Sequence, residues 1–184
     1  MEDLIKRSLS GDYEAYIELI QSIQGELFKI AKSQLNNIDD INDAIQETII
    51  NSYNKLYTLK ENKYFKTWII RILINECNNI YRQNKKRSNL FSKVLSNSNL
   101  YNMRNYNNDF QCTENNIDFY ILIEKLKPRE RLILSLYYKN LYSPTEISNI
   151  LNTNVNTIKS ELYRAKNKLK KYYKKGGYDN ERKE

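Results

Sequence analysis

The sequence predicts an all-α protein, made of two small helical domains joined by a flexible linker. Only 4 glycines and 2 prolines occur in 184 residues, too few for the many tight turns of a β-rich fold. Apolar residues recur at three- and four-residue spacing in two long stretches, which is the pattern of amphipathic helices. An Asn- and Ser-rich stretch without that period separates them. We therefore expect domains at residues 1–83 and 117–176, a linker at 84–116 and a polar tail at 177–184.

Three helices are predicted in the first domain. Ser10 or Asp12 can cap a helix whose apolar stripe covers residues 13–31. A second helix over residues 39–56 begins with two aspartates, which stabilise the positive end of a helix dipole. The apolar stripe of a third helix covers residues 64–81.

The second domain is predicted as a series of short helices. Helical periodicity resumes at Ile117, and Pro128 begins a further helix at a position that needs no backbone N–H donor. The segment Ser143-Pro144-Thr145-Glu146 has the spacing of a capping box, with proline at the first helical position. Asn152-Thr153-Asn154 then forms a turn, because asparagine tolerates the left-handed backbone conformation.

The last predicted helix has two chemically different faces. Its apolar residues fall within about 80° of arc; they are Val155, Ile158, Leu162, Ala165 and Leu169. The opposite face is polar and basic, and carries Asn156, Ser160, Tyr163, Arg164, Asn167 and Lys171. Such side chains suit base edges and phosphates, which favours a DNA-binding helix-turn-helix. An ordinary helical hairpin is the alternative.

The net charge of +8 is unevenly distributed along the chain. Residues 1–60 carry a net charge of −4, residues 61–104 of +7, residues 105–154 of −1 and residues 155–184 of +6. Either basic block alone could be a set of solvated helix ends. Two separated basic blocks favour contact with a polyanion at two places.

The composition argues against an enzyme, a metal site and a cofactor site. The chain has no histidine, which is the commonest general base and metal ligand, and it has no Gly-rich phosphate loop. Its two cysteines, Cys77 and Cys112, lack metal-binding spacing and fit a reduced cytoplasmic location. No apolar run approaches the roughly 20 residues that span a bilayer, so we expect a soluble protein without direct membrane insertion.

Residues 143–169 resemble the second DNA-binding region of bacterial extracytoplasmic-function (ECF) sigma factors, members of the sigma-70 family. The matching residues are Ser143, Glu146, Ile147, Thr157, Ile158, Lys159, Ser160, Leu162, Arg164, Ala165, Lys166, Lys168 and Leu169. The resemblance implies recognition of the minus-thirty-five promoter element by Asn156, Thr157, Lys159, Ser160, Tyr163, Arg164 and Asn167. Glu161 departs from the family, which often has arginine there, so we expect altered phosphate contact or promoter preference.

Two segments of the first domain resemble the same family. Asp43-Ala44-Ile45-Gln46-Glu47 is similar to the D-x-x-Q-E stretch that docks on the beta-prime clamp of RNA polymerase, which implies core polymerase binding by Asp43, Gln46 and Glu47. Spacing alone would leave an ordinary acidic helix start as the alternative. The segment from Tyr64 to Asn75 is similar to F-x-x-W-L-x-R-I-A-x-N, which recognises the opening minus-ten element. It implies minus-ten contacts by Tyr64, Lys66, Arg71 and Asn75, while Phe65 and Trp68 are expected in the core.

The resemblance implies an alternative sigma factor that binds core RNA polymerase and directs promoter-specific initiation, with a role in stress responses. Its implied partners are the beta-prime clamp coiled coil and the beta flap of the polymerase, promoter DNA, and an anti-sigma factor, often membrane-bound. One alternative is a stand-alone helix-turn-helix regulator, which would not explain the two segments of the first domain. Another is a nonspecific binder of nucleic acid or anionic membranes that uses the Lys-rich end.

Overall fold

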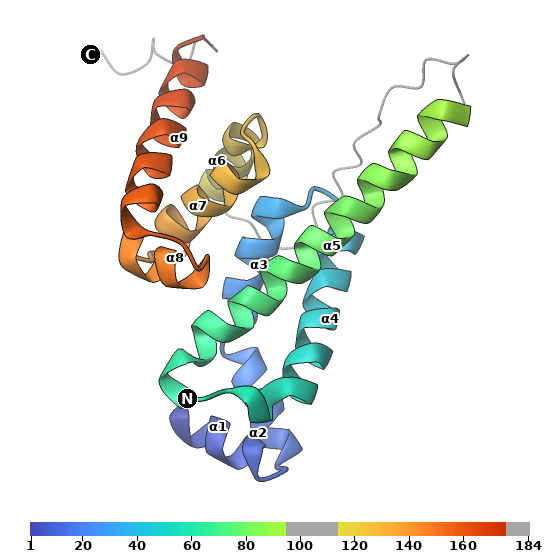
Figure 1. Ribbon diagram of the computed structural model, residues 1–184, viewed down its shortest axis with the longest axis vertical. Helices are drawn as coiled ribbons and strands as arrows, with labels where there is room; N and C mark the ends of the chain where they lie inside the picture. The colour runs from blue at the N-terminus through green and yellow to red at the C-terminus, as the bar shows by residue number, and fades with distance from the viewer. Residues whose placement is uncertain (95–113, 176–184) are drawn as a thin grey trace. The chain divides into compact units, whose positions relative to one another are not determined.

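The computed structural model describes residues 1–94 and 114–175, which form helices joined by short turns (Figure 1). Because these two ranges contain helices and no strand, the predicted all-α fold is confirmed. The chain divides into two compact units: residues 1–31 with 35–109, and residues 32–34 with 110–184. Among the residues described, no helix combines the length and the apolar character needed to cross a bilayer.

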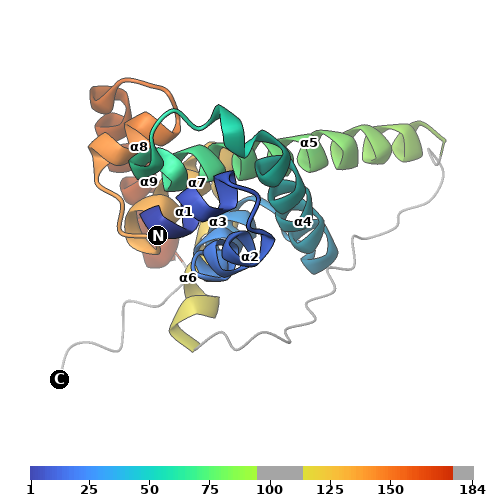
Figure 2. The same cartoon turned by 90° about the horizontal axis from the view of Figure 1, so that it is seen from below.

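The first unit is a bundle in which α1 packs against α2 and α4 lies along α5 (Figure 1 and Figure 2). Its elements are α1 (Glu2–Leu9), α2 (Tyr13–Gln21), α3 (Gln24–Gln34), α4 (Ile38–Lys55), the 3-10 turns η1 (Leu56–Thr58) and η2 (Asn62–Tyr64), and α5 (Phe65–Val94). Apolar residues of all five helices are completely buried and form the core, among them Ile5, Leu19, Leu27, Ala44, Phe65 and Leu73.

Hydrogen bonds fix the start of α2 and its position on α4. The Asp12 carboxylate accepts from the backbone N–H of Ala15 at 3.0 Å, so Asp12 rather than Ser10 is the cap. The buried Tyr16 hydroxyl donates to the Ile49 carbonyl oxygen at 2.7 Å, and Ser52 Oγ lies 2.8 Å from it. These contacts hold α4 against α2 and so orient the exposed face of α4.

The predicted single helix over residues 13–31 is wrong, because the structure has two helices, α2 and α3. The Ser22 hydroxyl donates to the Leu19 carbonyl oxygen at 2.6 Å, and the Ile23 N–H bonds to Ile20. Such local bonds compete with the regular helical ladder and end α2. The sequence prediction also missed α1.

Helix α5 is longer than predicted and continues to Val94, eleven residues into the expected linker (Figure 1). Residues 82–87 include several Arg, Lys and Gln, which are good helix formers even without an apolar face, so apolar periodicity did not reveal the extension. Helix α6 likewise begins at Glu114, before the predicted start at Ile117. Residues 95–113 of the expected linker, with Cys112, and the expected tail lie outside the described residues.

The second unit is built on its last helix, which contacts the three others. Its elements are α6 (Glu114–Glu124), α7 (Pro128–Tyr138), α8 (Pro144–Ile150) and α9 (Val155–Lys175). The predicted capping box is confirmed: the Ser143 side chain accepts from the Glu146 N–H at 3.3 Å, and Glu146 accepts from the Ser143 N–H at 2.8 Å. Asn152 adopts a φ of 46°, as predicted for the turn between α8 and α9.

Leu141, between α7 and α8, adopts a left-handed backbone conformation with a φ of 58°, and the residue is 84% exposed. A side chain with a Cβ is strained in that conformation by about 1 kcal/mol, and glycine is not. We expect Leu141→Gly to raise the free energy of unfolding of the second unit by up to about 1 kcal/mol. Urea denaturation followed by circular dichroism measures the change in the free energy of unfolding. Asn152→Gly is the control and should change little; a lower midpoint for Leu141→Gly would contradict the strain argument.

Candidate functional site

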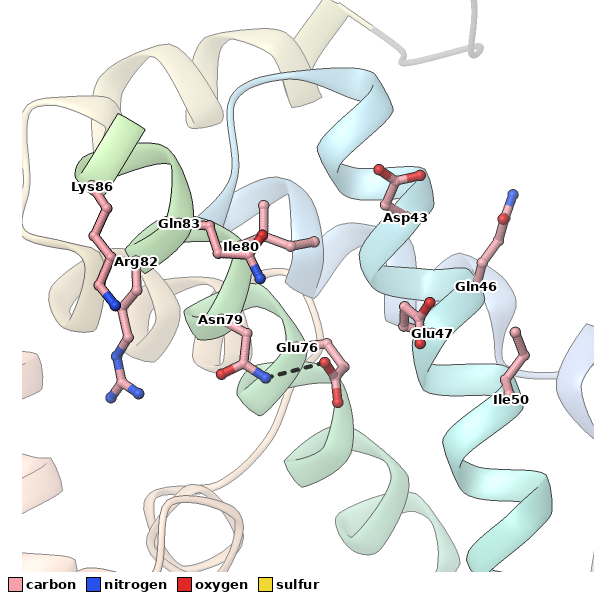
Figure 3. A pocket seen from close by; sticks show the side chains of 10 residues that line it. All are labelled: Asp43, Gln46, Glu47, Ile50, Glu76, Asn79, Ile80, Arg82, Gln83 and Lys86. Carbon is pink, nitrogen blue, oxygen red and sulfur yellow. Dashed lines mark hydrogen bonds between the residues drawn. The ribbon is translucent and has the colours of Figure 1, made fainter. Parts of the chain in front are cut away.

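A groove of about 720 Å³ lies between α4 and α5 in the first unit (Figure 3). Its lining comes from both helices: Asp43, Gln46, Glu47, Ile50, Glu76, Asn79, Ile80, Arg82, Gln83 and Lys86. The three residues predicted to bind core polymerase, Asp43, Gln46 and Glu47, are all exposed and share the α4 wall of this groove. The structure therefore brings these three predicted residues together on an accessible surface.

Side-chain hydrogen bonds join α4 and α5 at both ends of the groove. Asn84 Nδ2 donates to Asp40 Oδ2 at 2.7 Å near the start of α4. Further along, the half-buried Glu76 carboxylate accepts from Asn51 Nδ2 of α4 at 3.2 Å. It also accepts from its neighbour on α5, Asn79 Nδ2, at 3.2 Å (Figure 3). The two helices are antiparallel and are joined by hydrogen bonds at two places. The spacing of the groove walls is therefore set before any partner binds.

The α5 wall was missed by the sequence analysis as part of this surface. Acidic Glu76 lies on it with basic Arg82 and Lys86, so the groove carries both signs of charge. The signal was present in the sequence, because Glu76, Asn79 and Gln83 recur at three- and four-residue spacing and so share one face of α5. Assigning them to the α4 surface required knowing which helix packs on which.

The residues predicted to contact the minus-ten element do not all share one face. Arg71 and Asn75 are exposed and lie one helical turn apart on α5. Tyr64 lies in the turn before α5 and is 50% exposed. Lys66 lies on another face of α5, where its Nζ is 3.3 Å from Glu26 Oε2. The structure thus places Arg71 and Asn75 together, and Lys66 apart from them.

The apolar residues of the same segment are structural. Phe65 is fully buried and Trp68 is half-buried, with 6.0 Å between their ring centroids. Their predicted place in the core is therefore confirmed for Phe65 and holds in part for Trp68.

The described residues also show no reactive thiol or metal site in this unit. Burial raises the pKa of the Cys77 thiol to about 12, so the thiol stays protonated and unreactive at neutral pH. Within the described ranges, no cluster of three or more potential ligands could hold a metal ion.

Helix α9 presents the polar face that its sequence predicts. Ile158, Leu162 and Ala165 are buried on one side. On the other side most of the predicted DNA-contacting residues are exposed, namely Asn156, Thr157, Lys159, Ser160, Tyr163 and Arg164, while Asn167 is half-buried. Tyr163 is 69% exposed, compared with 37% for Tyr172 on the same helix.

Two ion pairs of opposite polarity join α7 to one flank of α9. Arg129 Nε donates to both carboxylate oxygens of Glu161, at 2.9 and 3.1 Å. Lys168 of α9 pairs with Glu130 of α7, whose carboxylate also accepts from the Lys127 N–H at 3.1 Å. The acidic departure noted at position 161 is therefore neutralised by a cation from another helix.

Comparison with protein families gives two matches that fall on the two units. The family model described as Sigma-70 region 2 matches residues 19–87. The model described as Sigma-70, region 4 matches residues 117–169. The first match contains both walls of the groove, and the second contains the helix-turn-helix.

Similar proteins and structures extend these matches over most of the chain. The ECF RNA polymerase sigma factor SigW of Bacillus subtilis is 27% identical, over 93% of this chain and 97% of that protein. The ECF RNA polymerase sigma-E factor of Haemophilus influenzae is 22% identical, over 89% of each. Among solved structures, CnrH in complex with the cytosolic domain of CnrY has a TM-score of 0.69 at 20% identity, over 94% of this chain and 96% of that one. The sigma factor RpoE of Bartonella quintana, in complex with the anti-sigma factor NepR, has a TM-score of 0.67 at 21% identity, over 86% and 96%.

Proposed function

Because the chain belongs to the sigma-70 family, we propose that it is an alternative sigma factor of the ECF class, which binds core RNA polymerase and directs it to particular promoters. The observation that carries this proposal is the presence of both sigma regions in order on one chain, each with an accessible polar surface. We assign core polymerase binding and minus-ten recognition to the first predicted domain, residues 1–83, and minus-thirty-five recognition to the second, residues 117–176.

The groove between α4 and α5 is the proposed docking site for core polymerase. Its α4 wall offers the Asp43 and Glu47 carboxylates and the Gln46 amide, which suit a helical partner rich in arginine. The clamp coiled coil of the beta-prime subunit is a partner of this kind in the family. The hydrogen bonds that hold α4 on α5 support this role, since a pre-formed surface loses less entropy on binding.

Promoter recognition uses surfaces on both units. Near the minus-ten element, Arg71 and Asn75 would hold the opening strand, with Tyr64 beside it and Lys66 adding positive charge. At the minus-thirty-five element, α9 would enter the major groove, as recognition helices do. Bases would be read from its exposed face by Asn156, Ser160, Tyr163, Arg164 and Asn167, with Thr157 and Lys159 on the flanks. The beta flap of the polymerase would hold the second unit.

The protein itself performs no chemistry in this scheme, because the polymerase transfers the nucleotides. We place its action in the cytoplasm, where the bacterial polymerase and its DNA are found. Two structures of similar fold contain the cytosolic domain of CnrY and the anti-sigma factor NepR. By analogy, we propose that an anti-sigma factor holds this chain inactive until a stress signal releases it.

A stand-alone helix-turn-helix regulator is the second candidate, favoured by the exposed face of α9 alone. The two are separated by selecting fragments from a library of AT-rich DNA with the chain, in the presence and absence of core polymerase from a low-GC bacterium. A sigma factor should select fragments that share two elements at a fixed spacing, and only when core is present. Equal selection without core would favour the stand-alone regulator.

Arg164→Ala should weaken promoter binding by the holoenzyme about 10- to 100-fold, because a good arginine–base contact contributes roughly 1–3 kcal/mol. Affinity for core polymerase should stay unchanged. Filter binding of a promoter fragment and fluorescence titration of core measure the two separately. Lys170→Ala removes an exposed charge from the same helix and is the control, with a much smaller loss. Loss of core binding in Arg164→Ala would contradict the assignment of α9 to DNA.

A further inference from the structure

Glu161 is the one acidic residue of α9, among eight basic residues between positions 155 and 175. Its side chain is only 20% exposed, and both carboxylate oxygens accept from Arg129 Nε of α7. The pair thus joins the flank of the proposed recognition helix to the first turn of a different helix. The sigma-factor assignment leaves this arrangement unexplained.

The position of Glu161 on α9 would bring it near DNA phosphates when α9 enters the major groove. At 100° per residue, Glu161 lies on the flank, about 110° from the centre of the exposed face that would read bases. A helix is about 10–12 Å across and the major groove is about 12 Å wide, so the flanks of an inserted helix approach the backbone. An uncompensated carboxylate there would repel phosphates, which makes the partner of Glu161 part of the DNA-binding surface.

We propose that Arg129, although it belongs to α7, contacts a DNA phosphate at the minus-thirty-five element and is positioned for that contact by Glu161. This inference rests on the proposed function. Arginine has five N–H donors, and the pair with Glu161 uses Nε, so the two terminal amino groups supply donors for a phosphate. The Arg129 side chain is 49% exposed, which leaves it accessible to the DNA.

The second ion pair supports a positioning role for this arrangement. Lys168 lies on the same flank of α9 as Glu161, two turns further on, and pairs with Glu130, the neighbour of Arg129. Two pairs of opposite polarity therefore join α7 to the same flank of α9 at two points. Arg129 is therefore held at a defined position beside the recognition helix.

The test compares the salt dependence of promoter binding by the holoenzyme for four variants. Arg129→Gln should lower affinity about 10-fold and reduce the slope of log affinity against log salt by about 0.9, the contribution of one phosphate contact. Arg129→Lys should retain most of that slope, because it keeps the charge. Glu161→Gln should keep the slope of the wild type, since the amide oxygen still accepts from Nε. Arg7→Gln breaks the 2.7 Å Arg7–Asp12 pair of the first unit with the same change in net charge, and should leave the slope unchanged.

The test depends on a difference between the two partners of the ion pair: Arg129→Gln should reduce the salt slope, whereas Glu161→Gln should not. A pair that only stabilises the fold would give Arg129→Gln and Glu161→Gln the same reduced melting temperature, and neither would change the salt slope. That outcome would overturn the inference. The proposed function is checked separately in the same samples: if the wild-type holoenzyme initiates transcription but Arg129→Gln keeps its slope, only the role of Arg129 is wrong.

Discussion

Replacing Gln46 and Glu47 together with alanine is expected to weaken binding to core RNA polymerase by about 100-fold, since truncated interface hydrogen bonds typically cost about 1–2 kcal/mol each. Both side chains are exposed on the α4 wall of the groove, and neither is needed for the core of the first unit. Alanine is also the best helix former, so α4 should remain intact. Titration of labelled core polymerase with each variant measures the change.

The matched control replaces Asn42 and Asn54 with alanine. Both are exposed on α4 but neither lines the groove. This pair of substitutions should leave the affinity for core polymerase within about threefold of the wild type, as is usual for residues outside an interface. Equal losses in the two double variants would show that α4 acts through its stability and not through the groove.

Phe65→Ala should lower the free energy of unfolding of the first unit by about 3–5 kcal/mol, which is typical for deleting a buried aromatic side chain. Phe65 is completely buried at the start of α5, so its loss leaves a cavity where α5 enters the core. Since domains are typically stable by about 5–15 kcal/mol, a large part of that stability would be removed.

The chain's single tryptophan makes this measurement specific to one unit. Trp68 lies next to Phe65, with ring centroids 6.0 Å apart, so its fluorescence reports unfolding of the first unit. Urea denaturation should show an earlier transition for Phe65→Ala. Tyr57→Ala is the control, because Tyr57 is 79% exposed, and its transition should move little. An unchanged midpoint in Phe65→Ala would contradict the description of this core.

Features set by neighbouring residues were predictable from the sequence. The capping box at Ser143 and the left-handed Asn152 each depend on a few consecutive residues, and the structure has both. The break between α2 and α3 is also local, but it depends on a hydroxyl bond from Ser22 within an unbroken apolar stripe. Apolar periodicity therefore could not detect it.

Features set by packing between distant segments were not predictable. The α4 wall was found from its own motif, whereas the α5 wall joins it through bonds such as Asn51 to Glu76, 25 residues apart. In the same way, Glu161 could be recognised in the sequence as unusual. Its partner Arg129, 32 residues earlier, became apparent only when α7 was seen to pack on α9.

Transcription in a purified system tests the central claim most directly. The components are this protein, bacterial core RNA polymerase free of other sigma factors, and a library of AT-rich upstream fragments, with the RNA 5′ ends mapped. We expect initiation at discrete start sites that disappears when the protein is omitted and when the Gln46 and Glu47 double variant replaces it. DNA binding without any initiation, using core from a related low-GC bacterium, would contradict the assignment as a sigma factor.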